Sequence, residues 1–218
     1  MKKICFYFFV ILALTVCSCS SNDDSIDNGN GGNPDPNPTP TTYQLGGIGP
    51  GGGRIFYLET NLEHGLETSG VITQAEWGYS SIPYPQNQSA VPNLSETLGS
   101  GLDNTNKIVD FIGDNNGVPY AAKICQDLVL NGKDDWYLPS KAELNKLFNY
   151  YKYENPSVAD FGVSETSWSS SQYVGTSSSQ TTHVFGIDWV IPMIGGYVHG
   201  NYYSPYDNYL TVRAVRSF

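Results

Sequence analysis

Residues 135–144 have the sequence DWYLPSKAEL, and this stretch contains the clearest helix start in the 218-residue chain. Ser140 and Glu143 have the spacing of a capping box, in which each side chain binds the backbone N–H of the other residue. Pro139 precedes the cap and restricts how the chain enters the helix. The apolar residues that follow recur at helical spacing, which predicts a helix with one buried face. They are Leu144, Leu147, Phe148 and Tyr151.

Two shorter helical patterns precede this one. The first covers residues 104–112, and its apolar side consists of Ile108, Phe111 and Ile112. The second begins after Pro119, a residue suited to a helix start. Its apolar side consists of Ala121, Cys125 and Leu128. The Asn-Gly pair at residues 131–132 is expected to close this helix.

Strand patterns lie on both sides of the helices. The glycines at residues 51–53 predict a tight turn, because they lack the ending of a phosphate loop and precede a strand at residues 54–58. Residues 68–101 predict a long irregular segment around Trp77. Further strands are predicted at residues 197–203 and 209–215, after one that places Phe185, Ile187 and Trp189 on a shared face. The chain is therefore predicted to be α+β, with two or three helices packed on an antiparallel sheet whose strands come from both ends.

The first nineteen residues indicate where the protein acts. The apolar run at residues 4–16 follows Lys2 and Lys3, and it is shorter than the roughly 20 residues of a membrane span but suits a secretory signal. Cys19 follows a small residue and precedes a polar stretch, a pattern that resembles the lipobox of bacterial lipoproteins. The resemblance implies cleavage before Cys19 and acylation of this cysteine. Cys17 is the alternative acceptor, and an ordinary secreted protein is the alternative class.

Three segments follow from this interpretation. Residues 1–18 are predicted to be the signal peptide, and residues 19–42 a lipidated tether rich in Asn, Pro and Gly that cannot form a packed core. Residues 43–218 are predicted to form one folded domain. The acidic residues shortly after Cys19 resemble an export signal of some lipoproteins. We therefore expect a lipid anchor in the outer membrane of the cell envelope and a domain exposed at the surface.

Charge and cysteine content restrict the partners and the chemistry. The formal net charge is −10, and loss of Lys2 and Lys3 with the signal makes the mature chain more acidic still. Its basic residues do not cluster, so nucleic acid is not an expected partner. Cys125 is the single cysteine left after processing and lipidation, so no intramolecular disulfide is expected. Its place on the apolar side of a helix predicts a buried, structural thiol.

Several motifs, taken in chain order, resemble the Lcl C-terminal domain family, named for the distal domain of a collagen-like bacterial adhesin. They are residues 53–57, 64–66, 127–132, 135–140, 143–144, 168–171 and 212–218. The resemblance implies a C-type-lectin-like α+β fold in which N- and C-terminal strands lie near each other. The adhesin that names the family binds sulfated glycosaminoglycans through a basic surface, whereas this chain is strongly acidic.

No metal site, cofactor or enzyme is predicted. A classical lectin calcium loop contains Glu-Pro-Asn, but residues 154–156 are Glu-Asn-Pro, and Asp134 and Asp135 alone supply too few oxygens for a hard cation. The histidines lie far apart and show no zinc spacing: His64, His183 and His199. We expect Trp136 and Trp168 in the core. Arg213 and Arg216 should point to opposite faces of a strand, with at least one of them paired to a carboxylate such as Asp135 or Glu143.

A tyrosine-rich segment near the C-terminal end is the candidate ligand-binding surface. Tyrosine combines a flat apolar ring with a hydroxyl, which suits sugar rings or peptide surfaces. The alternative is that these rings fill the core or simply cover the sheet. The candidate residues are Tyr197, Tyr202, Tyr203, Tyr206, Asp207 and Tyr209. The predicted function is a surface-displayed binding or adhesion domain for a glycan or an envelope or host protein; the alternative is a structural component of the envelope without a free ligand.

Overall fold

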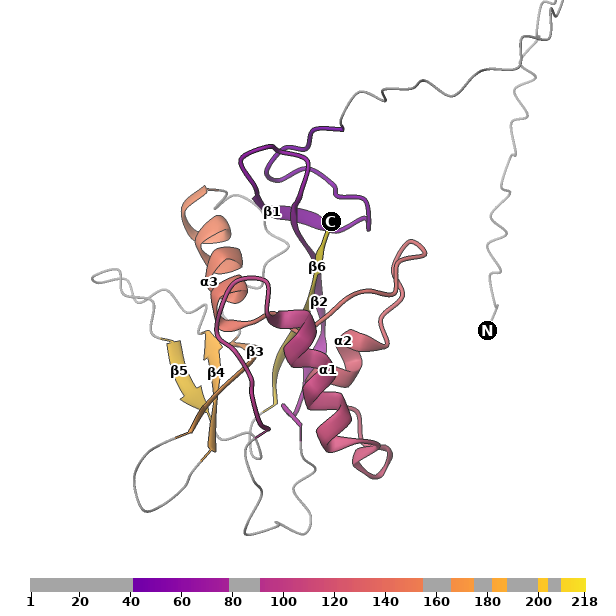
Figure 1. Cartoon of the computed structure of the whole chain (residues 1–218), viewed down its shortest axis with the longest axis vertical. Coiled ribbons are helices and arrows are strands. Elements are labelled where there is room, and N and C mark those ends of the chain that lie inside the picture. Colours follow the sequence, from indigo (N-terminus) through magenta and orange to yellow (C-terminus); the bar gives the residue numbers. More distant parts are fainter. Residues whose placement is uncertain (1–40, 79–90, 155–165, 175–181, 188–199, 204–208) are drawn as a thin grey trace, which may run out of the picture. The chain divides into compact units, whose positions relative to one another are not determined.

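The computed structural model describes residues 41–78, 91–154, 166–174, 182–187, 200–203 and 209–218, all within the compact unit Pro40–Phe218. In these residues the protein is α+β (Figure 1). The helices are α1 (Gly101–Ile112), α2 (Ala121–Gln126) and α3 (Lys141–Asn149), with a 3-10 turn at Asn115–Gly117 and a π-helical turn at Tyr150–Glu154. The strands are β1 (Arg54–Leu58), β2 (Gly65–Ala75), β3 (Ser167–Val174), β4 (Thr182–Ile187), β5 (Gly200–Tyr203) and β6 (Leu210–Ser217).

The strands of the described residues form one sheet in the order β1-β2-β6-β3-β4-β5. The prediction of a purely antiparallel sheet is wrong, because β6 pairs antiparallel with β2 but parallel with β3. Since β2 and β3 run in opposite directions, a strand between them can be antiparallel to only one. The expected closeness of N- and C-terminal strands is confirmed by the β2–β6 ladder.

Strand β2 corrects the prediction of an irregular segment that begins at Thr68. The strand continues to Ala75, and its register with β6 shifts on both sides of Val71. Gly70 has a φ of 81°, a backbone conformation that glycine adopts without steric cost. These irregularities are typical of β-bulges, which break the alternation of buried and exposed residues. The sequence therefore lacks the period-two pattern that normally reveals a strand.

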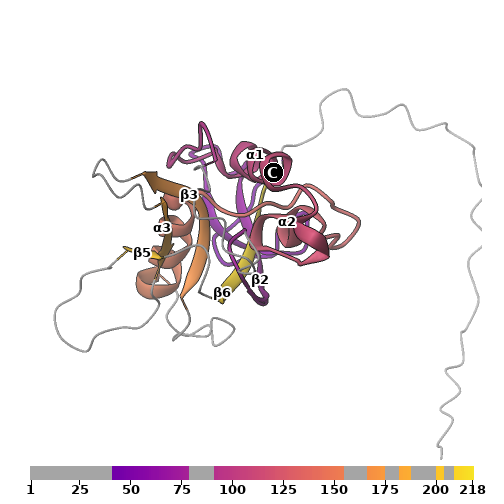
Figure 2. The ribbon, with the colours of Figure 1, turned by 90° about the horizontal axis from the view of Figure 1, so that it is seen from below.

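The two faces of the sheet pack against different helices. Figure 2 shows α3 on one side of β2 and β6, and α1 and α2 on the other. The predicted stripe of α3 is buried and packs with Phe56, Leu66 and Val215. The opposite core contains Ile108 of α1, Cys125 of α2, and both predicted core tryptophans, Trp136 and Trp168. The thiol of Cys125 is fully buried, and burial raises its pKa well above the ordinary value, so it packs as a small hydrophobic group.

Two details of the shorter helices differ from prediction. Phe111 is 44% exposed and lies outside the buried face of α1, which begins three residues earlier than predicted, at Gly101. Helix α2 ends at Gln126, so the Asn-Gly pair does not close it. Asn131 and Gly132 instead form a tight turn, in which Leu130 and Lys133 exchange both backbone hydrogen bonds. Both central residues have positive φ, as this kind of turn requires.

The capping box of α3 is confirmed. The Ser140 hydroxyl accepts a hydrogen bond from the Glu143 N–H at 3.3 Å, and the Ser140 N–H donates to the Glu143 carboxylate at 2.7 Å. The serine hydroxyl also donates to the Thr97 carbonyl at 2.8 Å. The cap therefore fixes the start of α3 and also holds the segment that leads into α1.

A buried ion network joins the first strands to the last. Glu67 and Arg216 are neighbours across the β2–β6 ladder, and their side chains pair at 2.9 Å. The Gly51 and Gly53 N–H groups each donate to the Glu67 carboxylate at 2.8 Å, so the predicted tight glycine turn is confirmed and encloses an internal carboxylate. Glu67 is fully buried. Arg216 also binds Asp135, one of the two predicted partners; the central acceptor, Glu67, was not predicted.

Arg213 lies on the face of β6 opposite to Arg216, as the alternation of strand side chains predicts. It is fully buried, and its Nε donates to the Ser167 hydroxyl at 3.1 Å.

Among the described residues, no helix is both long enough and apolar enough to cross a membrane.

Candidate functional site

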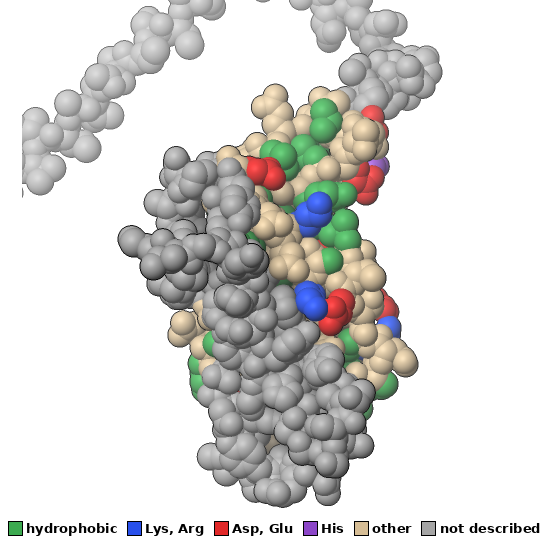
Figure 3. Space-filling view, turned by 90° about the vertical axis from the view of Figure 1, so that its left-hand side faces the viewer, with side chains coloured by type: hydrophobic (Ala, Val, Ile, Leu, Met, Phe, Trp, Pro, Cys, Tyr) green, Lys and Arg blue, Asp and Glu red, His purple; other side chains and the backbone are tan. Residues whose placement is uncertain are grey.

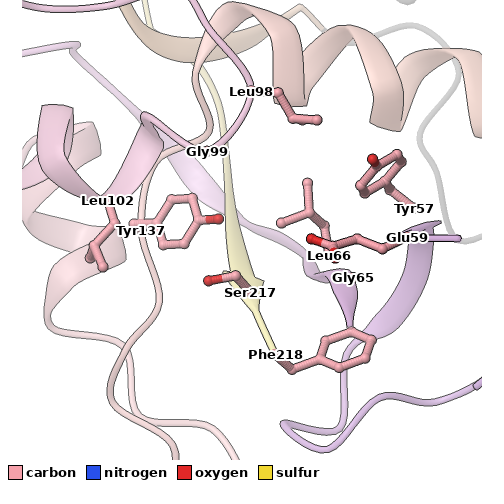
Figure 4. Close-up of a pocket in the computed structure, with 10 residues that line it drawn as sticks. All are labelled: Tyr57, Glu59, Gly65, Leu66, Leu98, Gly99, Leu102, Tyr137, Ser217 and Phe218. Atoms are coloured by element: carbon pink, nitrogen blue, oxygen red, sulfur yellow. The ribbon is translucent and has the colours of Figure 1, made fainter. Parts of the chain in front are cut away.

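A pocket of about 290 Å³ opens where the β1–β2 hairpin, the end of β6 and the segment before α1 meet. Its size is near the lower end of ligand pockets in proteins. Figure 4 shows that its lining comes from segments far apart in the sequence. The lining residues are Tyr57, Glu59, Gly65, Leu66, Leu98, Gly99, Leu102, Tyr137, Ser217 and Phe218.

One wall of the pocket is held by the α3 capping residue Glu143. Its carboxylate accepts hydrogen bonds from the Gly99 N–H at 3.0 Å and from the Tyr137 hydroxyl at 3.4 Å, in addition to the Ser140 N–H. Tyr137 also exchanges two 2.9 Å backbone hydrogen bonds with Val215 of β6. These bonds fix the Tyr137 side chain at the pocket wall, where the Ser217 hydroxyl is a further hydrogen-bonding neighbour (Figure 4).

Burial controls the protonation of this wall. It raises the pKa of the Tyr137 phenol, and the nearby Glu143 charge raises it further, so this hydroxyl stays protonated at neutral pH. Burial also raises the pKa of the Glu143 carboxyl, although the N–H donors of Ser140 and Gly99 favour the charged form. The wall therefore offers a neutral hydroxyl in front of a buried carboxyl group.

We expect Glu143 to make stability fall as the pH rises above about 4.3, the unfolded pKa of a glutamate. Its folded pKa is raised, so its contribution is complete below the unfolded pKa and is lost as the pH rises through the folded pKa. Urea unfolding at several pH values should show wild type losing stability relative to Glu143→Gln across this range. Parallel pH profiles for the two proteins would contradict the assignment.

The opposite wall comes from the end of β1. Tyr57 is half-buried, and Lys146 lies over its ring with Nζ 5.1 Å from the centroid. Glu59 is exposed, and Figure 4 shows its side chain extending into the pocket. Its backbone N–H donates to the His64 carbonyl at 2.9 Å, which closes the hairpin and fixes where the carboxylate projects.

Apolar side chains supply the rest of the lining. Leu66 is buried, whereas Leu98 and Leu102 are 41% and 42% exposed and so offer apolar surface to a ligand. Phe218 packs edge-on against Tyr43, with 4.8 Å between ring centroids. Tyr43, near the start of the described residues, therefore lies beside one wall of the pocket.

The lining can bind but offers no obvious catalytic pair. It combines one carboxylate and three hydroxyl groups with apolar surface, a composition typical of small-molecule sites. It includes no histidine or cysteine that could activate a nucleophile. Within the ranges that the structure describes, no three His, Cys, Asp or Glu side chains gather closely enough to hold a metal ion.

The structure leaves the predicted tyrosine-rich surface largely untested. Tyr202 and Tyr203 lie in β5, where the structure describes the backbone alone, and Tyr209 is 63% exposed just before β6. The other candidates, Tyr197, Tyr206 and Asp207, lie outside the described residues, as does the lipidation site Cys19.

Sequence reasoning missed the pocket. Tyr57, Tyr137 and Ser217 belong to three of the motifs that resemble the Lcl C-terminal domain family, and no spacing rule links them. The clearest available signal was the capping box, because Glu143 is the residue to which Tyr137 and Gly99 attach.

Charged side chains do not gather into one patch on the described part of the face in Figure 3, where basic and acidic groups are interspersed. The resemblance to the Lcl C-terminal domain remains a prediction. No family model matches the sequence, and no curated protein matches it.

Proposed function

We propose that this protein is a lipid-anchored surface lipoprotein whose C-type-lectin-like domain binds a short glycan. The observation that carries the proposal is the convergence of the Tyr57, Tyr137 and Ser217 hydroxyls and the Glu59 carboxylate on one pocket with an apolar base. A sugar presents hydroxyl groups at its edges and C–H groups on its faces. The pocket pairs hydrogen-bonding groups with apolar surface in the same way.

The rigidity of the pocket supports binding. Tyr137 is tied to β6 through its backbone and to Glu143 through its hydroxyl, so little side-chain freedom is lost when a ligand binds. The small volume suits a terminal or single sugar unit. The pocket would therefore recognise the end of a glycan chain.

The direct test is titration of the purified full chain with a panel of short oligosaccharides. The variant Tyr57→Phe/Ser217→Ala removes two hydroxyls and keeps the ring and the backbone. If each hydroxyl makes one net hydrogen bond of about 1 kcal/mol, we expect about a 30-fold loss of affinity for the sugar that binds best. Isothermal titration calorimetry measures this loss.

Tyr209→Phe is the matched control, because it removes an exposed hydroxyl outside the pocket. It should leave affinity unchanged. If Tyr209→Phe weakens binding and the double variant does not, the tyrosine-rich surface is the site. If no oligosaccharide of the panel binds, the proposed function is wrong.

The anchor is tested on intact cells that express the full chain. A labelled oligosaccharide that binds the purified protein should bind cells carrying wild type. It should not stay on cells carrying Cys19→Ala, because that variant lacks the proposed acylation site. Equal labelling of both strains would contradict lipid anchoring through Cys19.

A further inference from the structure

The pocket has one formally charged side chain in its lining, the carboxylate of Glu59. This side chain is exposed and extends across the pocket in Figure 4. Within the described part of the chain, no hydrogen bond or ion pair is formed by the Glu59 carboxylate. A carboxylate in this position is available to a ligand.

A second carboxyl group lies behind the opposite wall. Glu143 is fully buried and contacts the pocket through Tyr137 and Gly99. The Lys146 ammonium group is exposed and lies over the Tyr57 ring. Water screens an exposed ammonium group much more than a group enclosed in a pocket. The lining itself carries one acidic side chain and no basic one, so the formal charge of the pocket is negative.

We propose that the pocket selects a sugar that carries a free ammonium group over the N-acetylated or anionic form of the same sugar. This inference rests on the proposed function, that the pocket binds a short glycan. An ammonium group supplies three hydrogen-bond donors and a positive charge, which match the Glu59 carboxylate and the neighbouring hydroxyl oxygens. Acetylation removes the charge and leaves one amide donor.

Anionic sugars are disfavoured by the same geometry. A uronic acid or a sulfated sugar would place its charge beside Glu59, and no basic residue lines the pocket to compensate. Like charges at short distance repel, and the overall acidity of the chain adds to this repulsion.

The experiment measures the affinity of the full chain, at pH 6 and low salt, for a glucosamine trimer and for an N-acetylglucosamine trimer. These two probes differ in acetylation alone. We expect wild type to bind the glucosamine trimer about tenfold more tightly, the gain of one charge-assisted hydrogen bond. Glu59→Gln should abolish this preference and change affinity for the acetylated trimer by less than about twofold. Circular dichroism confirms that the exposed substitution preserves the fold.

Glu63→Gln is the matched control. It removes the same charge from the same β1–β2 connection, but Glu63 does not line the pocket. It should keep the preference, and loss of the preference in this variant would overturn the assignment to Glu59. A lysine tripeptide that binds as tightly as the amino sugar would overturn the selection of a sugar.

The two proposals fail differently. If both trimers bind wild type equally, or if Glu59→Gln weakens both equally, the ammonium preference is wrong and glycan binding stands. If neither trimer nor any other oligosaccharide binds, both proposals are wrong.

Discussion

Replacement of Glu67 by glutamine is expected to lower the free energy of unfolding by about 3–5 kcal/mol, the usual cost of removing one partner from a buried ion pair. The carboxylate of Glu67 is fully buried and accepts hydrogen bonds from Arg216, Gly51 and Gly53. An amide would leave the Arg216 charge with Asp135 alone, whose side chain is 48% exposed. It would also replace one acceptor oxygen by a donor that faces N–H groups.

Urea unfolding at pH 7 measures this loss. Asp103→Asn is the control, because it breaks an ion pair with Lys107 in which the two side chains are 66% and 37% exposed. Exposed pairs of this kind contribute at most about 1 kcal/mol. A Glu67→Gln variant no less stable than the control variant would show that the glycine turn and β6 do not depend on this carboxylate.

Replacement of Trp168 by alanine is expected to lower the free energy of unfolding by about 3–5 kcal/mol. The side chain is fully buried, and its indole N–H donates to the Ala75 carbonyl at 2.8 Å. Trp77 donates in the reverse direction, to the Ser169 carbonyl at 2.8 Å. The two tryptophans thus connect the end of β2 and the residues after it with β3 across the intervening β6, and alanine would leave a cavity and remove the indole donor to the Ala75 carbonyl.

Thermal and denaturant unfolding of Trp168→Ala measure the effect, with Trp168→Phe as an intermediate variant that keeps an aromatic ring but loses the indole donor. Tyr209→Ala serves as the control, since that side chain is 63% exposed and surface substitutions usually change stability by less than about 0.5 kcal/mol. If Trp168→Ala is as mild as the control, the indole is not a central part of the core.

Local patterns in the sequence predicted local structure well. The capping box placed the start of α3 correctly because it depends on four consecutive residues, Ser140 to Glu143. The buried stripe of α3 and the burial of Cys125 follow from helical periodicity alone. Strand β1 was predicted from a short apolar run, and its bounds agree with the prediction.

Long-range features could not be predicted in the same way. The parallel pairing of β6 with β3 depends on the sheet order, which no local pattern encodes. Strand β2 was missed because its register shifts break the alternation around Gly70. Glu67 gave no signal as the partner of Arg216, since the two residues are 149 positions apart.

The candidate pocket was missed for the same physical reason. It exists only after the β1–β2 hairpin, the segment before α1 and the end of β6 have come together. The tyrosine-rich segment stands out by its composition, and composition indicates what a surface could bind but not where a concave site forms.

The central position of β6 has a consequence for how the domain folds. Among the described strands, the β1–β2 hairpin and the β3–β4–β5 meander are joined into one sheet through β6 alone. The two parts therefore cannot form a continuous sheet until residues 210–217 are in place. Closing contacts over so great a sequence separation is slow, because the chain loses loop entropy before the contacts stabilise it. The sheet therefore stays incomplete until β6 is in place, and we expect the joining of its two halves to be a late step of folding.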